Sequence, residues 1–282
     1  MGFFDAFNEW ILRLPTGIIY LVVLMGAGIF LTCRLKFVQF RHFFLAFSDT
    51  FKSLGKQKDE KSKGTISSFQ ATATALAGTL GTGNIIGVAT AIVSGGPGAV
   101  FWMCISSFFG MATKFAEIVL AVHFRTQNKK GETIGGPMYY ISQGLHRHGL
   151  AVLFSVSCVG ASFGVGNLSQ SNAISDALFS TFGIPKWIVG LSVMLIIGLI
   201  IIGGIKRIGN VTERLVPIMA LTYFVGSLAA IVVNFKELPG ALMQIVCDAF
   251  QPSAVSGGIL GYLTSKSVEF GISRGVFSNE AG

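Results

Sequence analysis

Between residues 76 and 87 the chain places small polar side chains among closely spaced glycines. The polar side chains are those of Thr79, Thr82 and Asn84. Hydroxyl, amide and backbone carbonyl oxygens are suitable ligands for a hard cation such as Na⁺. Residues 64–113 contain no charged side chain and no His, so a proton relay through a carboxylate is not expected there. The stretch therefore predicts cation or substrate binding by neutral groups.

The glycines of the same stretch predict that a helix is interrupted. They are Gly78, Gly81, Gly83 and Gly87. Each costs a helix about 1 kcal/mol relative to alanine, yet the flanking residues are uncharged and favour helix. We therefore expect one discontinuous helix over residues 65–94. Close packing against another helix is the alternative interpretation, because Gly83 and Gly87 form a small-x-x-x-small pair.

The two helix ends at such a break have opposite electrostatics. Carbonyl groups around residues 76–78 end the first half and suit a cation, whereas amide groups around residues 83–85 begin the second half and suit a carboxylate. Non-helical backbone at the bilayer midplane is tolerated only where it faces protein or a water-filled cavity. This pattern is typical of secondary transporters that bind a substrate beside a coupling ion.

The composition of the chain indicates an integral membrane protein of the all-α class, a multi-span helical bundle. Hydrophobic residues make up 51% of the 282 residues and charged residues only 12%, about half the charged share of a soluble domain. Apolar stretches with few or no charged residues predict spans over residues 14–33, 65–94, 99–122, 149–175, 187–205 and 215–235, with a weaker span over 254–275. Glycine and proline at 95–98 predict a turn after the second span. The basic, Phe-rich run at 37–44 predicts a helix on the membrane surface.

The net charge of +8 is explained by membrane topology, and no nucleic-acid partner is expected. Residues 34–63, 123–147 and 206–214 hold eight, four and three of the 21 Lys and Arg residues. The positive-inside rule places these segments in the cytoplasm and the N-terminus outside, in the plasma (inner) membrane. Because Cys and His residues are scattered and no carboxylate pair lies within a span, neither a metal centre nor an enzyme active site is expected.

Five stretches of the sequence resemble one family of carriers. They read AGTLGTGNIIGVATA at 77–91, GGPGAVFWM at 95–103, FGMATK at 109–114, GGPMYY at 135–140 and RGVFSNEAG at 274–282. Together they resemble the alanine or glycine:cation symporter family of amino acid carrier proteins. The resemblance implies a LeuT-type inverted-repeat fold, Na⁺ or H⁺ as the coupling ion without any other cofactor, and alanine or glycine as the substrate.

The resemblance also implies a set of site residues in the unwound part of the first core helix. Carried onto this chain, the substrate-binding residues are Thr82, Gly83 and Asn84, joined by Gln170 from the third core helix, and the cation-binding residues are Ala77, Gly78 and Thr79.

The same resemblance divides the chain into three parts. Residues 14–33 are expected to form an extra N-terminal helix, residues 65–235 the first five-helix repeat, and residues 254–282 the start of the second repeat. Family members are longer, so we expect a fold that is truncated after the start of the second repeat. The favoured function is cation-coupled symport of small neutral amino acids. The alternative is a non-transporting fragment, or a membrane packing partner that lacks the complete ion and substrate site.

Overall fold

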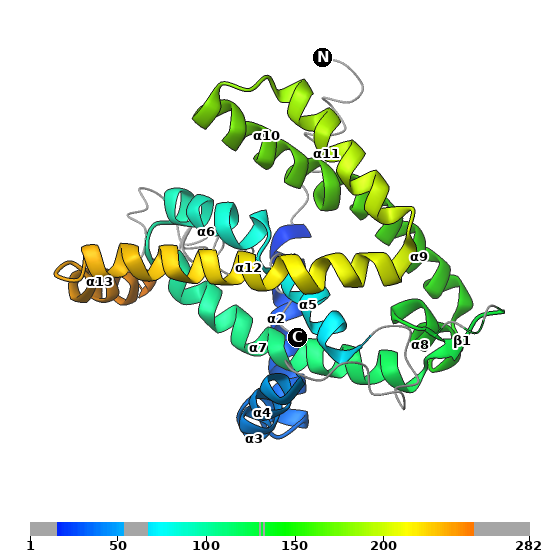
Figure 1. Ribbon diagram of the computed structural model, residues 1–282. Coiled ribbons are helices and arrows are strands. Elements are labelled where there is room, and N and C mark those ends of the chain that lie inside the picture. Colours follow the sequence, from blue (N-terminus) through cyan, green and yellow to red (C-terminus); the bar gives the residue numbers. More distant parts are fainter. Residues whose placement is uncertain (1–15, 54–66, 130, 132, 251–282) are drawn as a thin grey trace, which may run out of the picture. The chain divides into compact units, whose positions relative to one another are not determined.

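The computed structural model describes residues 16–53, 67–129, 131 and 133–250, and most of these residues are helical (Figure 1). The helices are α2 (Thr16–Arg34), α3 (Val38–Arg41), α4 (Phe43–Ser53), α5 (Ser68–Thr79), α6 (Thr82–Gly95), α7 (Gly98–His123), α8 (Pro137–Gln143), α9 (His148–Ala161), the π-helix η1 (Ser162–Leu168), α10 (Ser169–Phe182), α11 (Lys186–Ile201), α12 (Gly204–Val233) and α13 (Leu238–Phe250). A short antiparallel sheet pairs β1 (Thr126–Gln127) with β2 (Thr133–Ile134). The all-α class predicted from the composition is confirmed for this part of the chain.

Several of the described helices are apolar enough to lie in a membrane. Three helical stretches are also long enough to cross it: Phe69–Gly95, which includes the turn between α5 and α6, Gly98–His123 and Gly204–Val233. Shorter apolar helices cover Val22–Arg34, His148–Ala161, Lys186–Ile201 and Leu238–Phe250. Because α9 continues through η1 into α10, the predicted span over 149–175 corresponds to helical structure from His148 to Phe182. The predicted span over 254–275 lies outside the described residues.

The turn predicted at residues 95–98 is confirmed. Helix α6 ends at Gly95 and α7 begins at Gly98. Between them Gly96 has a φ of 79°, a left-handed conformation that glycine adopts without a steric penalty. The run at residues 37–44, predicted as one helix, is divided between α3 and α4, with exposed side chains at Phe40 and Phe44. Its location on a membrane surface stays a prediction.

Residues 206–214, which lie between the predicted spans over 187–205 and 215–235, are helical. These residues begin α12, and the connection between α11 and α12 is only Ile202 and Gly203. Gly204 has a φ of 68°, which permits the sharp turn. All the charged residues of α12 are Lys, Arg or Glu, which are good helix formers, so they extend the apolar helix instead of interrupting it.

The described chain divides into two compact units, which are treated separately. The first contains residues 16–42, 86–114 and 231–250. Its buried core joins Ala91 of α6 to Ala99 and Met103 of α7. Helix α13 packs tightly on α7 at Gly98. A Cβ atom at this position would lie only 2.5 Å from the Ala249 backbone nitrogen, so glycine permits the close approach.

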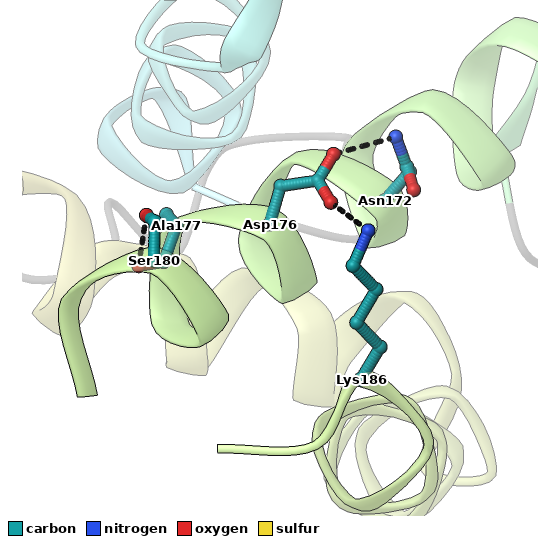
Figure 2. A network of polar contacts seen from close by, with 5 residues as sticks. All are labelled: Asn172, Asp176, Ala177, Ser180 and Lys186. Atoms are coloured by element: carbon teal, nitrogen blue, oxygen red, sulfur yellow. Dashed lines mark hydrogen bonds and ion pairs between the residues drawn. The ribbon is translucent and has the colours of Figure 1, made fainter. Parts of the chain in front are cut away.

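The second unit contains residues 43–85 and 115–230. In it α10 and α11 form a helical hairpin whose turn includes Gly183, with a φ of 68°. Figure 2 shows how the hairpin is fastened: the Asp176 carboxylate receives a hydrogen bond from Asn172 and pairs with the Lys186 ammonium group. In α8 of the same unit, burial and the negative charge of Glu117 raise the pKa of the Tyr140 phenol.

Candidate functional site

The predicted interruption of the second span is confirmed, and it is shorter than the glycine spacing implied. Helix α5 ends at Thr79 and α6 begins at Thr82, so only Leu80 and Gly81 lie outside the helices. Gly78 is still helical in α5, and Gly83 is already helical in α6. The break is therefore a two-residue turn, not an extended unwound segment.

At the turn, hydrogen bonds between residues three apart take the place of some of the four-apart bonds of an α-helix. The backbone N–H of Leu80 still makes the helical bond to the Leu76 carbonyl, at 2.9 Å, whereas that of Gly81 donates to the Gly78 carbonyl at 3.1 Å. The backbone N–H of Asn84 donates to the Gly81 carbonyl at 3.3 Å. These short-range bonds satisfy backbone groups that would otherwise be costly to leave unpaired in a membrane.

The Asn84 side chain connects the two half-helices. Its Nδ2 donates to the Thr79 carbonyl at a distance of 2.5 Å, so a side chain of the first turn of α6 caps the last turn of α5. An Asn amide has two donor hydrogens and an acceptor oxygen. One donor is used in the cap, and the remaining groups give the amide further hydrogen-bonding capacity beside the break.

The predicted cation-binding residues all lie in the last turn of α5. Ala77, Gly78 and Thr79 belong to a helix end whose carbonyl groups carry partial negative charge. The Thr79 hydroxyl donates to the Ala75 carbonyl at 3.2 Å, which leaves the lone pairs of the hydroxyl oxygen to act as a ligand. The donor set of this turn is thus neutral oxygen, the chemistry that suits Na⁺.

The predicted substrate-binding residues of the second half-helix form its first turn. Thr82, Gly83 and Asn84 open α6, where the backbone N–H groups carry partial positive charge and favour a carboxylate. Carbonyl and amide ends of opposite polarity are therefore separated by the two residues of the turn.

Gln170 comes to the break from a distant part of the sequence. A Cβ atom at Gly81 would lie 3.4 Å from Gln170 Oε1 and 3.5 Å from its Nε2. The same Cβ would lie only 2.9 Å from the Gly78 carbonyl oxygen. Glycine at position 81 thus allows the Gln170 amide to approach the turn closely. The roles of Gln170 and of the six residues in the two half-helices remain predictions.

A π-helix precedes Gln170, and its presence was not predicted. The segment η1 covers Ser162–Leu168, and Gln170 is the second residue of the α-helix that follows. π-helices are rare and are frequently found at functional sites, because the wider turn redirects the side chains. In the sequence, the π-helix coincides with the polar, glycine-containing run of η1 and early α10.

Contacts between α5 and α12 were also not predicted. The Gln70 side chain donates to Asn210 Oδ1 and to Glu213 Oε2, both at 2.9 Å. One turn farther along α5, the Thr74 and Thr212 hydroxyl oxygens lie 3.0 Å apart. The partners are separated by about 140 residues in the sequence, and no local pattern identifies such a pairing.

The sequence matches known proteins along its whole length. The profile of the sodium:alanine symporter family matches residues 1–282. The sodium/alanine symporter AgcS of Methanococcus maripaludis is 47% identical over 266 residues, which cover 93% of this chain and 57% of that protein. An uncharacterized transporter of Haemophilus influenzae is 47% identical over 263 residues, 93% of this chain and 57% of its own length. The probable sodium/glutamine symporter GlnT of Bacillus subtilis is 40% identical over 263 residues, 93% of this chain and 53% of its own length.

These relatives are all longer than the matched region, so the chain spans somewhat more than half the length of the curated relatives it matches. The resemblance seen in the five sequence stretches is confirmed by the match over the full chain. The chain belongs to the sodium:alanine symporter family.

Proposed function

We propose that this chain forms part of a secondary active transporter that couples the movement of Na⁺ to the symport of a small neutral amino acid. H⁺ is the alternative coupling ion. The observation on which the proposal depends is the two-residue break between α5 and α6, with Asn84 and Gln170 beside it. A break of this kind offers a cation and a carboxylate adjacent sites of opposite polarity.

Each predicted residue has a defined role in this proposal. The last turn of α5 supplies oxygen ligands for the cation, and the first turn of α6 supplies N–H groups for the substrate carboxylate. The Gln170 amide contributes a hydrogen bond to the polar end of the substrate. The residues are Ala77, Gly78 and Thr79 for the cation, and Thr82, Gly83, Asn84 and Gln170 for the substrate.

The proposed substrate is neutral because the site residues carry no charge. A charged substrate side chain taken out of water needs an opposite charge nearby, and the seven proposed residues offer none. Among relatives, one is named a sodium/alanine symporter and another a probable sodium/glutamine symporter. These names support neutral amino acids as a class, with alanine and glycine as the first candidates.

The proposed architecture is a LeuT-type inverted repeat in the plasma (inner) membrane. Residues 14–33 are the extra N-terminal helix, residues 65–235 the first repeat, and residues 254–282 the beginning of the second. The N-terminus lies outside. Family membership and the successive apolar helices of the described chain support this arrangement.

Transport is tested with a completed protein, in which this chain is joined to the part of the Methanococcus relative that lies beyond the match. The protein is reconstituted into vesicles, and uptake of labelled alanine is driven by an inward Na⁺ gradient, an inward H⁺ gradient or neither. We expect uptake with the Na⁺ gradient, and competition by unlabelled glycine, serine and glutamine then ranks the substrates.

The control is this chain alone, in the same vesicles. Its uptake shows whether transport requires the joined segment of the Methanococcus relative. Equal uptake with and without either gradient would reject coupled symport. Absence of uptake by the completed protein, together with correct folding and insertion, would favour the alternative of a non-transporting packing partner.

Membrane orientation is tested by labelling single cysteines in a background in which Cys33, Cys104, Cys158 and Cys247 are replaced by Ser. Lys206→Cys and Lys236→Cys lie near opposite ends of α12. We expect an impermeant maleimide to label position 236 from outside intact cells and position 206 only after the cells are opened. The reverse pattern would overturn the proposed orientation.

A further inference from the structure

A row of polar contacts, which we call the α5–α12 seam, joins the first half-helix to the start of α12. Its members are Gln70 and Thr74 on α5 and Asn210, Thr212 and Glu213 on α12. All of them belong to the second compact unit. No residue of the seam belongs to the proposed cation or substrate site.

Gln70 makes contacts in two directions. Its Oε1 accepts a hydrogen bond from the Ser67 backbone N–H at 3.1 Å, and the Ser67 hydroxyl accepts one from the Gln70 N–H at 3.1 Å. This reciprocal capping box satisfies two backbone donors at the start of α5. Because the cap holds Oε1, the Nε2 group is directed to Asn210 and Glu213.

Because the helix is broken after α5, these contacts affect the position of α5. In a continuous helix, α6 would hold α5 in place through the backbone hydrogen bonds that run across every turn. At Leu80 and Gly81 the helical structure stops. Two backbone hydrogen bonds, from Gly81 to Gly78 and from Asn84 to Gly81, remain at the turn. Side-chain contacts add to them in positioning α5: the Asn84 cap at its end, and the seam along its first two turns.

We propose that Gln70 is a positioning residue, which through the α5–α12 seam holds α5 where its last-turn carbonyls can bind the coupling ion. The inference rests on the proposed function, since it concerns the affinity of that cation site. Gln70 lies in the first turn of α5 and the proposed ligands lie in the last. A displacement of the first turn is transmitted to them because the 12-residue helix is a rigid rod about 18 Å long.

Exchanging the amide and the carboxylate between positions 70 and 213 distinguishes a positioning role of Gln70 from a role only in capping α5. In Gln70→Glu the new carboxylate can still accept from the Ser67 N–H, and Glu is a favoured residue of the capping box. It cannot donate to Glu213, and the two carboxylates repel each other. In Gln70→Glu/Glu213→Gln the donor is moved to α12 and the acceptor to α5, so the contact across the seam is restored. Glu213→Gln alone retains an acceptor for Gln70 and should have a small effect.

The measurement is amide hydrogen exchange of the full chain in lipid nanodiscs, titrated with NaCl at constant ionic strength using choline chloride. We expect Gln70→Glu to speed exchange in residues 71–79 and to raise the Na⁺ concentration for half-maximal protection about tenfold, the loss expected for one hydrogen bond to a charged group. The double variant should return both values to within about twofold of those of the original chain.

A matched control is Asn172→Asp, which also places a second carboxylate beside an acidic residue, here Asp176. It should leave exchange in residues 71–79 unchanged. Thr74→Val adds no charge and removes a hydroxyl that lies 3.0 Å from that of Thr212 and also donates to the Gln70 carbonyl at 2.7 Å. It should act in the same direction as Gln70→Glu if that variant does not fold.

Two results would overturn the proposal: unchanged exchange and Na⁺ dependence in Gln70→Glu, or a double variant that resembles Gln70→Glu. A chain in which no variant responds to Na⁺ would contradict the proposed cation site. In that case the exchange of residues 71–79 without Na⁺ still decides whether Gln70 holds α5 in place.

Discussion

Two apolar stretches of similar length respond differently to residues that disfavour helix. The stretch Phe69–Gly95 is divided at Leu80 and Gly81, whereas Gly204–Val233 is one uninterrupted helix. The second stretch contains Pro217 in its interior as well as several glycines. Its proline lacks the N–H that would bond to the Glu213 carbonyl. The number of helix-breaking residues therefore does not determine where a helix ends.

The difference is explained by the hydrogen bonds that are available at each place. At the break, the Asn84 amide caps the Thr79 carbonyl, and short-range bonds satisfy neighbouring groups. The stretch from α5 to α6 thus has a specific alternative to continuous helix. Such an alternative is favourable only where particular side chains stabilise it, and in the proposed function the same side chains bind the ligand.

The largest effect is expected from removing the cap that makes the break stable. Asn84→Ala loses the hydrogen bond to Thr79 and the proposed contact with the substrate carboxylate. In the completed protein, Na⁺-driven uptake of labelled alanine should fall to the level of vesicles without protein. Asn172→Ala, which removes an amide that bonds to Asp176 on α10, should retain uptake. Unchanged uptake by Asn84→Ala, with the same dependence on Na⁺, would contradict the site assignment.

An intermediate effect is expected from adding one methyl group to each stretch. In Gly81→Ala the Cβ would lie 2.9 Å from the Gly78 carbonyl oxygen, and such overpacking typically costs about 1–3 kcal/mol. In Gly226→Ala of α12 the Cβ has no atom within 4 Å, and alanine stabilises a helix by about 0.5–1 kcal/mol relative to glycine. Thermal unfolding in detergent should give a lower midpoint for the first variant and an equal or higher one for the second. Equal decreases would show that the break does not differ from an ordinary helix.

The smallest effect is expected at an exposed ion pair outside both stretches. Asp176 and Lys186 have side chains that are 48% and 55% exposed, and exposed pairs contribute about 0–1 kcal/mol. Asp176→Asn should lower the unfolding midpoint by less than Gly81→Ala does. The decrease caused by Asp176→Asn should become smaller still in 0.5 M salt, where the screening length is about 4 Å. A larger loss than that of Gly81→Ala would mean that the hairpin of α10 and α11, not the break, limits stability.

The sequence predicted the features that depend on local composition. Long uncharged runs identified the apolar helices, and glycine spacing located the break and the turn at Gly96. The extent of the break was overestimated, because Gly78 and Gly83 remain helical when their neighbours satisfy the backbone. The predicted span over 215–235 begins after the charged residues 206–214, whereas α12 includes them, because Lys, Arg and Glu favour helix.

Contacts between distant residues could not be predicted. The Ser67–Gln70 capping box is readable as a local pattern, but its extension to Asn210 and Glu213 depends on how α5 and α12 pack. The family resemblance predicts Gln170 as a substrate-binding residue, but it does not predict that Gln170 approaches Gly81. The π-helix before it depends on a register change that local propensity does not specify.

In the proposed function, the break between α5 and α6 binds the amino acid and its coupling ion together. The most direct measurement is equilibrium binding of labelled alanine to the purified completed protein, in NaCl and in choline chloride, for the unmodified protein and for Asn84→Ala. An ion that raises the affinity for a substrate is itself bound more tightly, by the same factor, when the substrate is present. We expect Na⁺ to tighten alanine binding at least about tenfold, a typical coupling of 1–3 kcal/mol, and we expect Asn84→Ala to abolish this effect. Equal affinity in the two salts, or an undiminished effect of Na⁺ in Asn84→Ala, would contradict the account.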